Sequence, residues 1–379
     1  HFEAADAELW AKVANMLVAM VAVIVFSWLS RKFYRQQLTI IFSGFCLVCF
    51  VAFSLSLNQI DGTTAWLFYL FGDLFSTLMV ATFFVFLNDS VTPDSAKRLY
   101  GLVGLGGVLG GAFGSITVRA FVDSGNVSST TWMWVCFVIT FMITVLAVSA
   151  GRYVAKPADT RKDEEAPEEK KEHPALAGAK LVFRSRYLFS IVSIVGLYEI
   201  VSTLVDYQFT RTILNFVEKR ELGAAFGSAY VYMNVTAVIV QLFLTSFIMR
   251  KFGVKTALMI LPLALLVVSA GYLILPVLMV GMLMPSADGG LSYSLNQSAK
   301  EALYVPTTRD EKYKAKAFID MFVQRFAKVL AIGVTLVITA LFKEYGSVRW
   351  LSLGTVVVIA LWLLAVGYAG REFEKKAQG

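Results

Sequence analysis

Charged residues are scarce in this chain. They account for 16% of its 379 residues, whereas apolar residues account for 57%. Soluble globular domains carry about 25% charged and about 45–50% apolar residues. Long apolar runs recur from one end of the chain to the other, which excludes a soluble domain held by a single membrane anchor. We therefore expect a membrane protein that crosses the bilayer many times.

Histidine and cysteine are also rare. Neither His1 nor His173 has a second ligand at helical spacing, so we expect no metal site. Cys46 and Cys49 have the spacing of a redox or zinc pair, but no second pair accompanies them, and Cys136 stands alone. All three lie inside apolar runs and are predicted to be small buried side chains. No nucleophile with a base and no hydrolase-like carboxylate pair stands out, so we expect neither an enzyme nor a cofactor.

The apolar runs have the length of transmembrane helices. Backbone groups cannot stay unpaired in lipid, and runs of about 20 residues suit helices, whereas barrel strands need only about ten. We therefore expect an all-α polytopic membrane protein. Its eleven predicted spans cover residues 11–29, 38–57, 64–88, 99–122, 131–153, 183–213, 224–249, 255–273, 275–303, 315–342 and 347–370.

The net charge of +7 is distributed along the chain in a way that predicts topology and argues against a nucleic-acid partner. Lys and Arg gather in alternate connections, which the positive-inside rule places in the cytoplasm. The C-terminus is then cytoplasmic and the first residue lies outside. We expect a monomer in the bacterial inner membrane, in contact with the lipid bilayer. The basic connections are 30–37, 89–98, 151–186, 250–255, 300–316 and the tail 371–379.

The spans divide into two halves around a charged segment that has too few apolar residues to bury a core. A chain that starts outside without a signal sequence suggests that one N-terminal helix precedes this sequence, which makes six helices in each half. Arg-Lys-Phe at 31–33 and again at 250–252 marks a weak repeat. Repeated six-helix halves are typical of the major facilitator fold, whose substrate site lies at the midplane. The predicted parts are an N-terminal half (1–153), a cytoplasmic linker (154–182), a C-terminal half (183–370) and a tail (371–379).

Glycine is concentrated in two places. Residues 101–114 read GLVGLGGVLGGAFG, and without the Lys of a phosphate-binding loop they predict close helix packing through small residues. Pro285, Gly289 and Gly290 surround Asp288 and predict a break or kink in the middle of a span. Such a break either lines a substrate site or acts only as a gating hinge.

Ionisable side chains within spans are the candidate functional residues. Each costs about 2.5–3.5 kcal/mol on insertion scales, so its presence calls for a reason. Glu199 and Asp206 are seven residues apart and share a helical face. Lys316, Asp320 and Lys328 form a polar stripe. For Asp73 and Asp206, a structural ion pair or a deeply set helix end is the alternative. The candidates are Asp73, Glu199, Asp206, Asp288, Lys316, Asp320, Arg325 and Lys328.

Several parts of the sequence together resemble the ATP/ADP translocase family. They are the segments Phe84–Gly107, Tyr293–Pro306 and Lys314–Asp320, the turn that contains Lys255, and Lys328. This branch of the major facilitator superfamily comprises nucleotide transporters of plastids and obligate intracellular bacteria. The resemblance implies that Asp73 and Asp206 occupy positions of functional acidic residues, which are Glu in the family. It further implies that a functional lysine lies in the region of Lys316 or Lys328.

These observations lead to one main hypothesis and two alternatives. We expect a secondary transporter that uses alternating access to move an anionic, nucleotide-like or phosphorylated solute. Lys316 and Lys328 would hold its negative charge, while Asp73 and Asp206 take part in coupling or gating. The first alternative is a proton-coupled carrier of another metabolite, with one of these aspartates as the proton site. The second is a lipid-handling or signalling membrane protein of the same fold.

Overall fold

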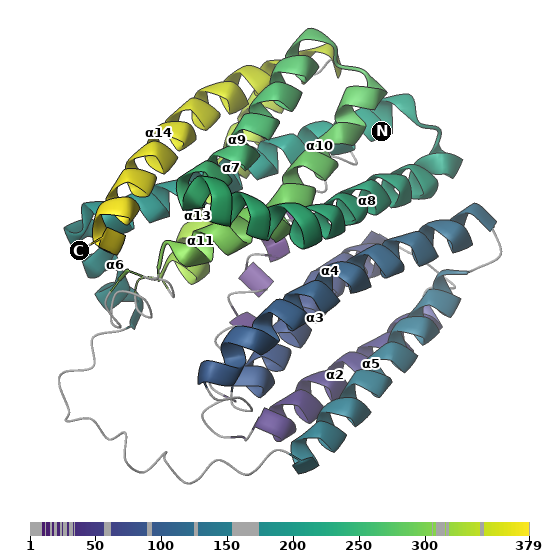
Figure 1. The fold of residues 1–379 in the computed structure, drawn as a ribbon. Coiled ribbons are helices and arrows are strands. Elements are labelled where there is room, and N and C mark those ends of the chain that lie inside the picture. Colours follow the sequence, from purple (N-terminus) through teal and green to yellow (C-terminus); the bar gives the residue numbers. More distant parts are fainter. Residues whose placement is uncertain are drawn as a thin grey trace. The chain divides into compact units, whose positions relative to one another are not determined.

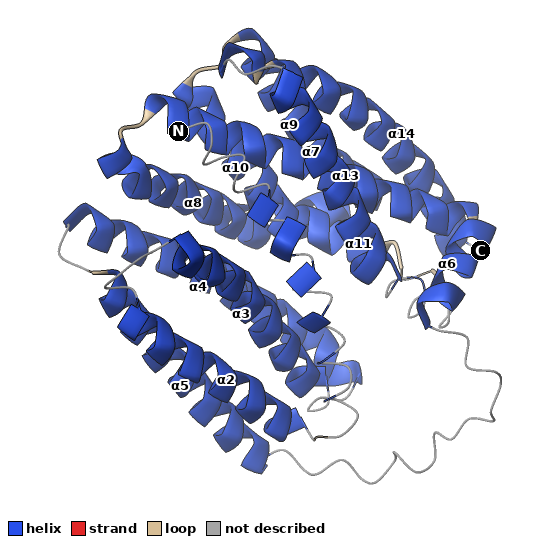
Figure 2. Cartoon of the chain, turned by 180° about the vertical axis from the view of Figure 1, so that it is seen from behind, coloured by secondary structure: helices blue, strands red, loops and turns tan. Residues whose placement is uncertain are grey.

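The structure is a computed structural model of the chain, and all of its regular elements in the described residues are helices. Figure 2 shows these helices joined by short connections in the described part. Two compact units are present: a smaller unit of residues 7–103 and 124–169, and a larger unit of residues 1–6, 104–123 and 170–379. The described residues are 35–56, 62–88, 93–124, 128–153, 174–304, 306–307, 318–341 and 345–378, with isolated residues between 10 and 33 and Ala315.

The smaller unit is built on α2 (Arg35–Ser56), α3 (Gly62–Asn88) and α5 (Ser129–Tyr153), with α2 packed against the other two. Aromatic rings fill its core. Phe50 and Phe71 meet edge to face with centroids 5.2 Å apart. Cys46 is buried in the same cluster, and Cys49 and Cys136 pack against it. All three thiols are free, as expected for cysteines that act as small apolar side chains.

The larger unit is organised around one long helix, α7 (Arg186–Phe216), whose side chains are mostly buried. Ser185 caps it by accepting a hydrogen bond from the Leu188 N–H at 3.3 Å. Neighbouring helices pack along α7, as Figure 1 shows. They are α6 (Pro174–Arg184), α8 (Leu222–Ile239), α10 (Leu278–Leu291), α13 (Gln324–Leu341) and α14 (Trp350–Gln378).

Helix α9 (Thr245–Ile274) follows α8 and contains a turn of the chain at a glycine. Gly253 has φ 80° and ψ 171°, which interrupts the helical path of α9. Residues with a Cβ rarely adopt this conformation, so glycine is required here. The sequence predicts a connection at 250–255, and the turn lies within it.

The predicted break does not occur at Asp288. Helix α10 continues through Pro285 and both glycines, and the irregular part follows it as a π-helical turn, η4 (Ser292–Asn296). The glycines serve packing instead. A Cβ on Gly289 would overlap the Met233 side chain, and one on Gly290 would lie 2.7 Å from Cγ2 of Thr236. Their lack of a side chain lets α8 approach α10, and this contact supports the helix across the proline.

The glycine-rich segment in α4 (Pro93–Ser124) forms a close helix contact at one described position. A Cβ on Gly111 would lie 2.6 Å from Oδ1 of Asn234 in α8, within the same unit. Gly106, Gly107, Gly110 and Gly114 have nothing within 4 Å of such an atom. The sequence predicts close helix packing along the whole segment, but among residues 105–114 only Gly111 makes such a contact.

Six helices of the described part are long and apolar enough to cross a membrane: 37–56, 62–80, 130–150, 186–216, 219–274 and 345–376. The predicted number of eleven spans remains a prediction, and about half of the first one, residues 11–29, lies outside the described residues. The predicted linker overlaps α6, because residues 174–182 are helical, whereas 154–173 lie outside the described residues. The predicted boundaries of the halves also remain predictions.

Candidate functional site

Helix α7 places three polar side chains on one face. Glu199, Ser202 and Asp206 follow one another at spacings of three and four residues, which align on a helix. Opposite them, Asp288 on α10 accepts a hydrogen bond from the Ser202 hydroxyl, with 2.5 Å between Oγ and Oδ2. The carboxylates of Glu199 and Asp206 lie close enough to that of Asp288 to interact with it electrostatically. Two helices that are distant in sequence thus bring three carboxylates together.

Asp288 is incompletely satisfied. Its Oδ2 bonds to Ser202, whereas its Oδ1 is buried and makes no hydrogen bond of good geometry among the described residues, although the Tyr198 hydroxyl lies nearby. Leaving a buried acceptor unpaired costs about 1–3 kcal/mol, so native structures rarely do so without a reason. Oδ1 can either accept a hydrogen bond from a ligand or carry a proton itself.

Two cations face this group. Lys300 on α11 (Gln297–Ala302) and Lys328 on α13 both interact electrostatically with Glu199. Both ammonium groups lie more than 4.0 Å from the Glu199 carboxylate, so neither lysine forms a direct ion pair with it in the described part of the chain. The lysines and Glu199 are therefore close without direct contact, and a bound anion can change the electrostatic interaction between them.

Tyrosines complete the surroundings of the carboxylates. Tyr198 and Tyr293 both interact electrostatically with Asp288 and Glu199. The Tyr198 ring packs on the buried Trp362 of α14, with centroids 5.6 Å apart. We call Glu199, Ser202, Asp206, Asp288, Lys300 and Lys328 the charged cluster. The sequence analysis missed Ser202 and Lys300; the position of Ser202 one turn after Glu199 was the available signal.

Other polar residues of α7 join helices to one another. The Gln208 amide donates to the Val348 carbonyl at 3.0 Å, and the Thr212 hydroxyl lies 2.7 Å from the Tyr272 hydroxyl. Arg211 is buried, and its guanidinium lies 5.6 Å from the centre of the Tyr207 ring. These contacts lie toward the C-terminal end of α7 and fasten it to α9 and to the chain before α14.

The structure does not place the remaining predicted site residues in the charged cluster. Asp73 is exposed on α3 in the smaller unit. Arg325 is half-buried on α13. Lys316 and the side chain of Asp320 lie outside the described residues, although Asp320 belongs to the π-helical turn η6 (Ile319–Val323). Lys328 is therefore the member of the predicted stripe whose side chain can be placed.

Metal binding finds no support in the described residues. No group of three or more His, Cys, Asp and Glu side chains there has the arrangement of a metal site. The three carboxylates of the charged cluster instead have a serine hydroxyl and lysines as their neighbours.

Comparison with known proteins gives two family matches. Residues 9–310 match the model of the Major Facilitator Superfamily, and residues 272–373 match that of the TLC ATP/ADP transporter. Among individual proteins, the chain is 25% identical to the chloroplastic ADP,ATP carrier protein 1 of Arabidopsis thaliana over 335 residues, which cover 79% of this chain and 52% of that protein. It is 24% identical to ADP,ATP carrier protein 1 of Rickettsia conorii over 341 residues, 81% of this chain and 68% of the relative. The chain thus spans about half the length of its plant relatives.

Solved structures agree on the fold. A bacterial homologue of the human lysosomal transporter Spinster matches with a TM-score of 0.58 at 14% identity, over 98% of this chain and 90% of that one. The fucose:proton symporter of E. coli matches with a TM-score of 0.58 at 12% identity, over 97% and 93%. The matched families and proteins are transporters and carriers, in agreement with the expectation that this chain is no enzyme. Because the superfamily model matches residues 9–310, most of its length, the chain belongs to the Major Facilitator Superfamily, and within it the chain resembles the ATP/ADP carriers.

Proposed function

We propose that this chain is the membrane part of a secondary transporter that moves an anionic, nucleotide-like solute by alternating access, in exchange for a second such solute. The charged cluster is the observation that carries the proposal, because lysines and carboxylates meet there on helices of a transporter fold. Its relatives are named as ADP,ATP carriers, which makes ATP and ADP the first solutes to test.

Lys300 and Lys328 supply the positive charge that an anion needs. Glu199 attracts both ammonium groups without forming a direct ion pair with either of them. A phosphate group entering the cluster would compete with Glu199 for the lysines, and the released carboxylate would then repel Asp206 and Asp288. Binding of the anion and the charge of the carboxylates are thereby coupled.

The other predicted residues keep a place in this proposal. We assign Lys316, Asp320 and Arg325 to the same substrate pathway on the chain that leads into α13, and Asp73 to a coupling role in the smaller unit. We further propose a monomer in the inner membrane with its C-terminus in the cytoplasm. It has an N-terminal half at 1–153, a linker at 154–182, a C-terminal half at 183–370 and a tail at 371–379.

A proton-coupled carrier of another metabolite is the second candidate. The observation in its favour is the unpaired Oδ1 of Asp288 beside two further carboxylates. Three carboxylates in one place repel each other, and a bound proton relieves part of that repulsion. A proton site would then lie on α10 or α7 and alternate between loaded and empty states during transport.

Uptake by the full-length protein reconstituted into liposomes separates these candidates. An exchanger takes up labelled ATP only when ADP or ATP is present inside, and an uncoupler leaves this uptake unchanged. Lys328→Gln should reduce exchange at least about tenfold, the cost of about 1.4 kcal/mol of lost anion stabilisation. Glu218→Gln is the matched control, because Glu218 is exposed near the start of α8 and pairs with Arg220.

The outcomes are distinct. Uptake that needs no internal nucleotide, collapses with an uncoupler and is lost in Asp288→Asn would favour the proton-coupled carrier. If no solute from a panel of nucleotides and phosphorylated metabolites is taken up, or if Lys328→Gln behaves as Glu218→Gln does, the proposed role of the charged cluster is wrong.

A further inference from the structure

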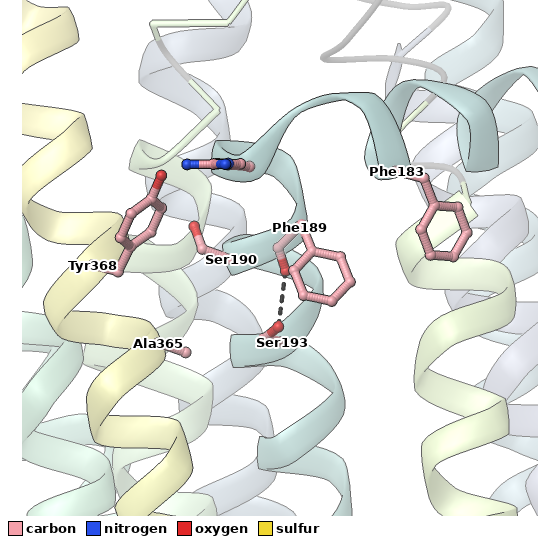
Figure 3. Close-up of a pocket in the computed structure, with 7 residues that line it drawn as sticks. Phe183, Phe189, Ser190, Ser193, Ala365 and Tyr368 are labelled. Carbon is pink, nitrogen blue, oxygen red and sulfur yellow. Dashed lines mark hydrogen bonds between the residues drawn. The ribbon is translucent and has the colours of Figure 1, made fainter.

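A pocket of about 340 Å³ lies where α6, the start of α7 and the end of α14 meet, far along α7 from Asp206. In Figure 3, Tyr368 and Ala365 line it from α14, Ser190, Ser193 and Phe189 from α7, and Phe183 from the end of α6. Arg186 also lines it. The transport proposal makes no use of this pocket.

The polar groups of the pocket suit an anion. Arg186 is exposed and has no hydrogen bond or ion pair with any described residue. The hydroxyls of Ser190 and Ser193 already donate to the carbonyls of Tyr187 and Phe189, at 2.6 and 2.9 Å. The Tyr368 hydroxyl has no such bond in the described part of the chain. The guanidinium and the phenol therefore remain as donors, a pair that matches the oxygens of a phosphate.

The apolar groups of the pocket suit hydrocarbon. Phe183 is 76% exposed and Phe189 is 50% exposed, with ring centroids 6.4 Å apart. Along α14, next to Ala365, Leu364 is 70% exposed and Leu361 is 51% exposed. An apolar surface thus leads away from the pocket along a helix apolar enough to cross the bilayer. A soluble phosphate compound would leave this surface uncovered, whereas an acyl chain would follow it.

The surroundings of the pocket suit a position at the edge of the membrane. Arg184 is exposed at the end of α6, a short helix that buries Val182 while it exposes Phe183. At the end of α14, Lys376 lies with its Nζ 5.6 Å from the centre of the Tyr187 ring. Basic side chains at the ends of spans, beside a short helix with one apolar face, are typical of contact with anionic headgroups.

We propose that this pocket binds an acidic phospholipid. The phosphate accepts hydrogen bonds from Arg186 and Tyr368, and one acyl chain lies against Phe189 and Leu364. Such a lipid joins α6 and α7 to α14, so its binding stabilises the larger unit. The site is separate from the charged cluster and does not depend on which solute is transported.

Native mass spectrometry of the full-length protein in detergent tests this site. Phosphatidylglycerol and phosphatidylcholine of the same chain length are titrated in parallel. The wild-type protein should bind phosphatidylglycerol about fivefold more tightly, and Arg186→Gln should remove that preference, since one basic residue near an anionic surface contributes about this much. Tyr368→Phe should weaken binding by a smaller factor. Arg250→Gln, an exposed arginine of the 250–255 turn that bonds to the Ser246 carbonyl, is the control.

Several results would overturn the proposal. The first is equal binding of both lipids by the wild-type protein, and the second is an equal loss of the lipid preference in Arg250→Gln. The third comes from a separate thermal-unfolding measurement, if inorganic phosphate raises the melting temperature as much as phosphatidylglycerol does. The last of these would identify a site for free anions. Should Arg186→Gln fail to fold, as judged by gel filtration, the comparison of Tyr368→Phe with wild type decides, because that variant keeps the ring and removes only the hydroxyl.

Discussion

The Ser202 hydroxyl links α7 to the Asp288 carboxylate of α10. It satisfies one oxygen of a side chain whose other oxygen is buried without a partner in the described structure. A serine is short enough to bring the two helices close, and it carries no charge of its own to alter the balance of the charged cluster. At this scale, the geometry of the cluster depends on an uncharged residue.

Replacing Ser202 by Ala should therefore destabilise the protein. The substitution removes the hydrogen bond that Oδ2 of Asp288 accepts, at a cost of about 1–3 kcal/mol. The measurement is the midpoint of thermal unfolding of the full-length protein in detergent. Ser228→Ala is the control, because the Ser228 hydroxyl donates to the Ala224 carbonyl of its own helix. Equal midpoints for the two variants would contradict the role given to Ser202.

Helices α8 and α10 meet through glycine. A Cβ on Gly290 would lie 2.7 Å from Cγ2 of Thr236, closer than carbon atoms approach without displacement. The helix that carries Asp288 is therefore positioned both by its packing against α8 and by the hydrogen bond to α7. At the scale of elements, contact with neighbouring helices replaces the break expected from Pro285 and the glycines.

Gly290→Ala should thus lower stability by about 1–3 kcal/mol through overpacking, although alanine favours helices. Gly110→Ala is the matched control, since a Cβ there meets nothing within 4 Å and the helical preference alone should apply. Thermal unfolding compares the two. A Gly290 variant as stable as the Gly110 variant would show that α8 moves away at no cost.

Gly253 offers a second test at the scale of elements. Its φ of 80° permits the turn within α9, and alanine in that conformation is strained by about 1–3 kcal/mol. Gly253→Ala should lower the unfolding midpoint, whereas Gly367→Ala, in the middle of α14 with open space around it, should not. The outcome that would count against this reading is an unchanged midpoint for Gly253→Ala.

The molecule as a whole should be oriented by its basic connections. In the variant Glu218→Cys, whose new thiol lies between two predicted spans, the thiol should react from outside with a membrane-impermeant maleimide. In Lys376→Cys it should react only after the membrane is disrupted. The background is a protein in which Cys46, Cys49 and Cys136 are replaced by Ala. Glu218 and Lys376 are both exposed, so accessibility within the protein does not limit labelling. Reversed labelling would invert the topology.

Much of the helical architecture was predictable from local pattern. Runs such as 38–57 and 64–88 match α2 and α3 to within a few residues, because in lipid the chain satisfies its backbone by forming helices wherever it is apolar. The predicted burial of the cysteines is confirmed for Cys46, whereas Cys49 and Cys136 are only partly buried. Prediction failed where a local signal met a tertiary contact. Pro285 and its glycines suggested a break, but α10 continues through them, and the two glycines pack against Met233 and Thr236.

The sequence by itself determined the class of the protein, its helices and the short set of charged residues within spans. Hydrophobicity, and the free-energy cost of a charge in an apolar span, are properties of each residue and its neighbours in the chain. Only the tertiary structure decided which charges meet. Asp288 lies more than eighty residues from Ser202, and Lys328 lies further still from Glu199, yet the packing of α7, α10 and α13 joins them. Electrostatic energy depends on distance in space, which no spacing along the chain specifies.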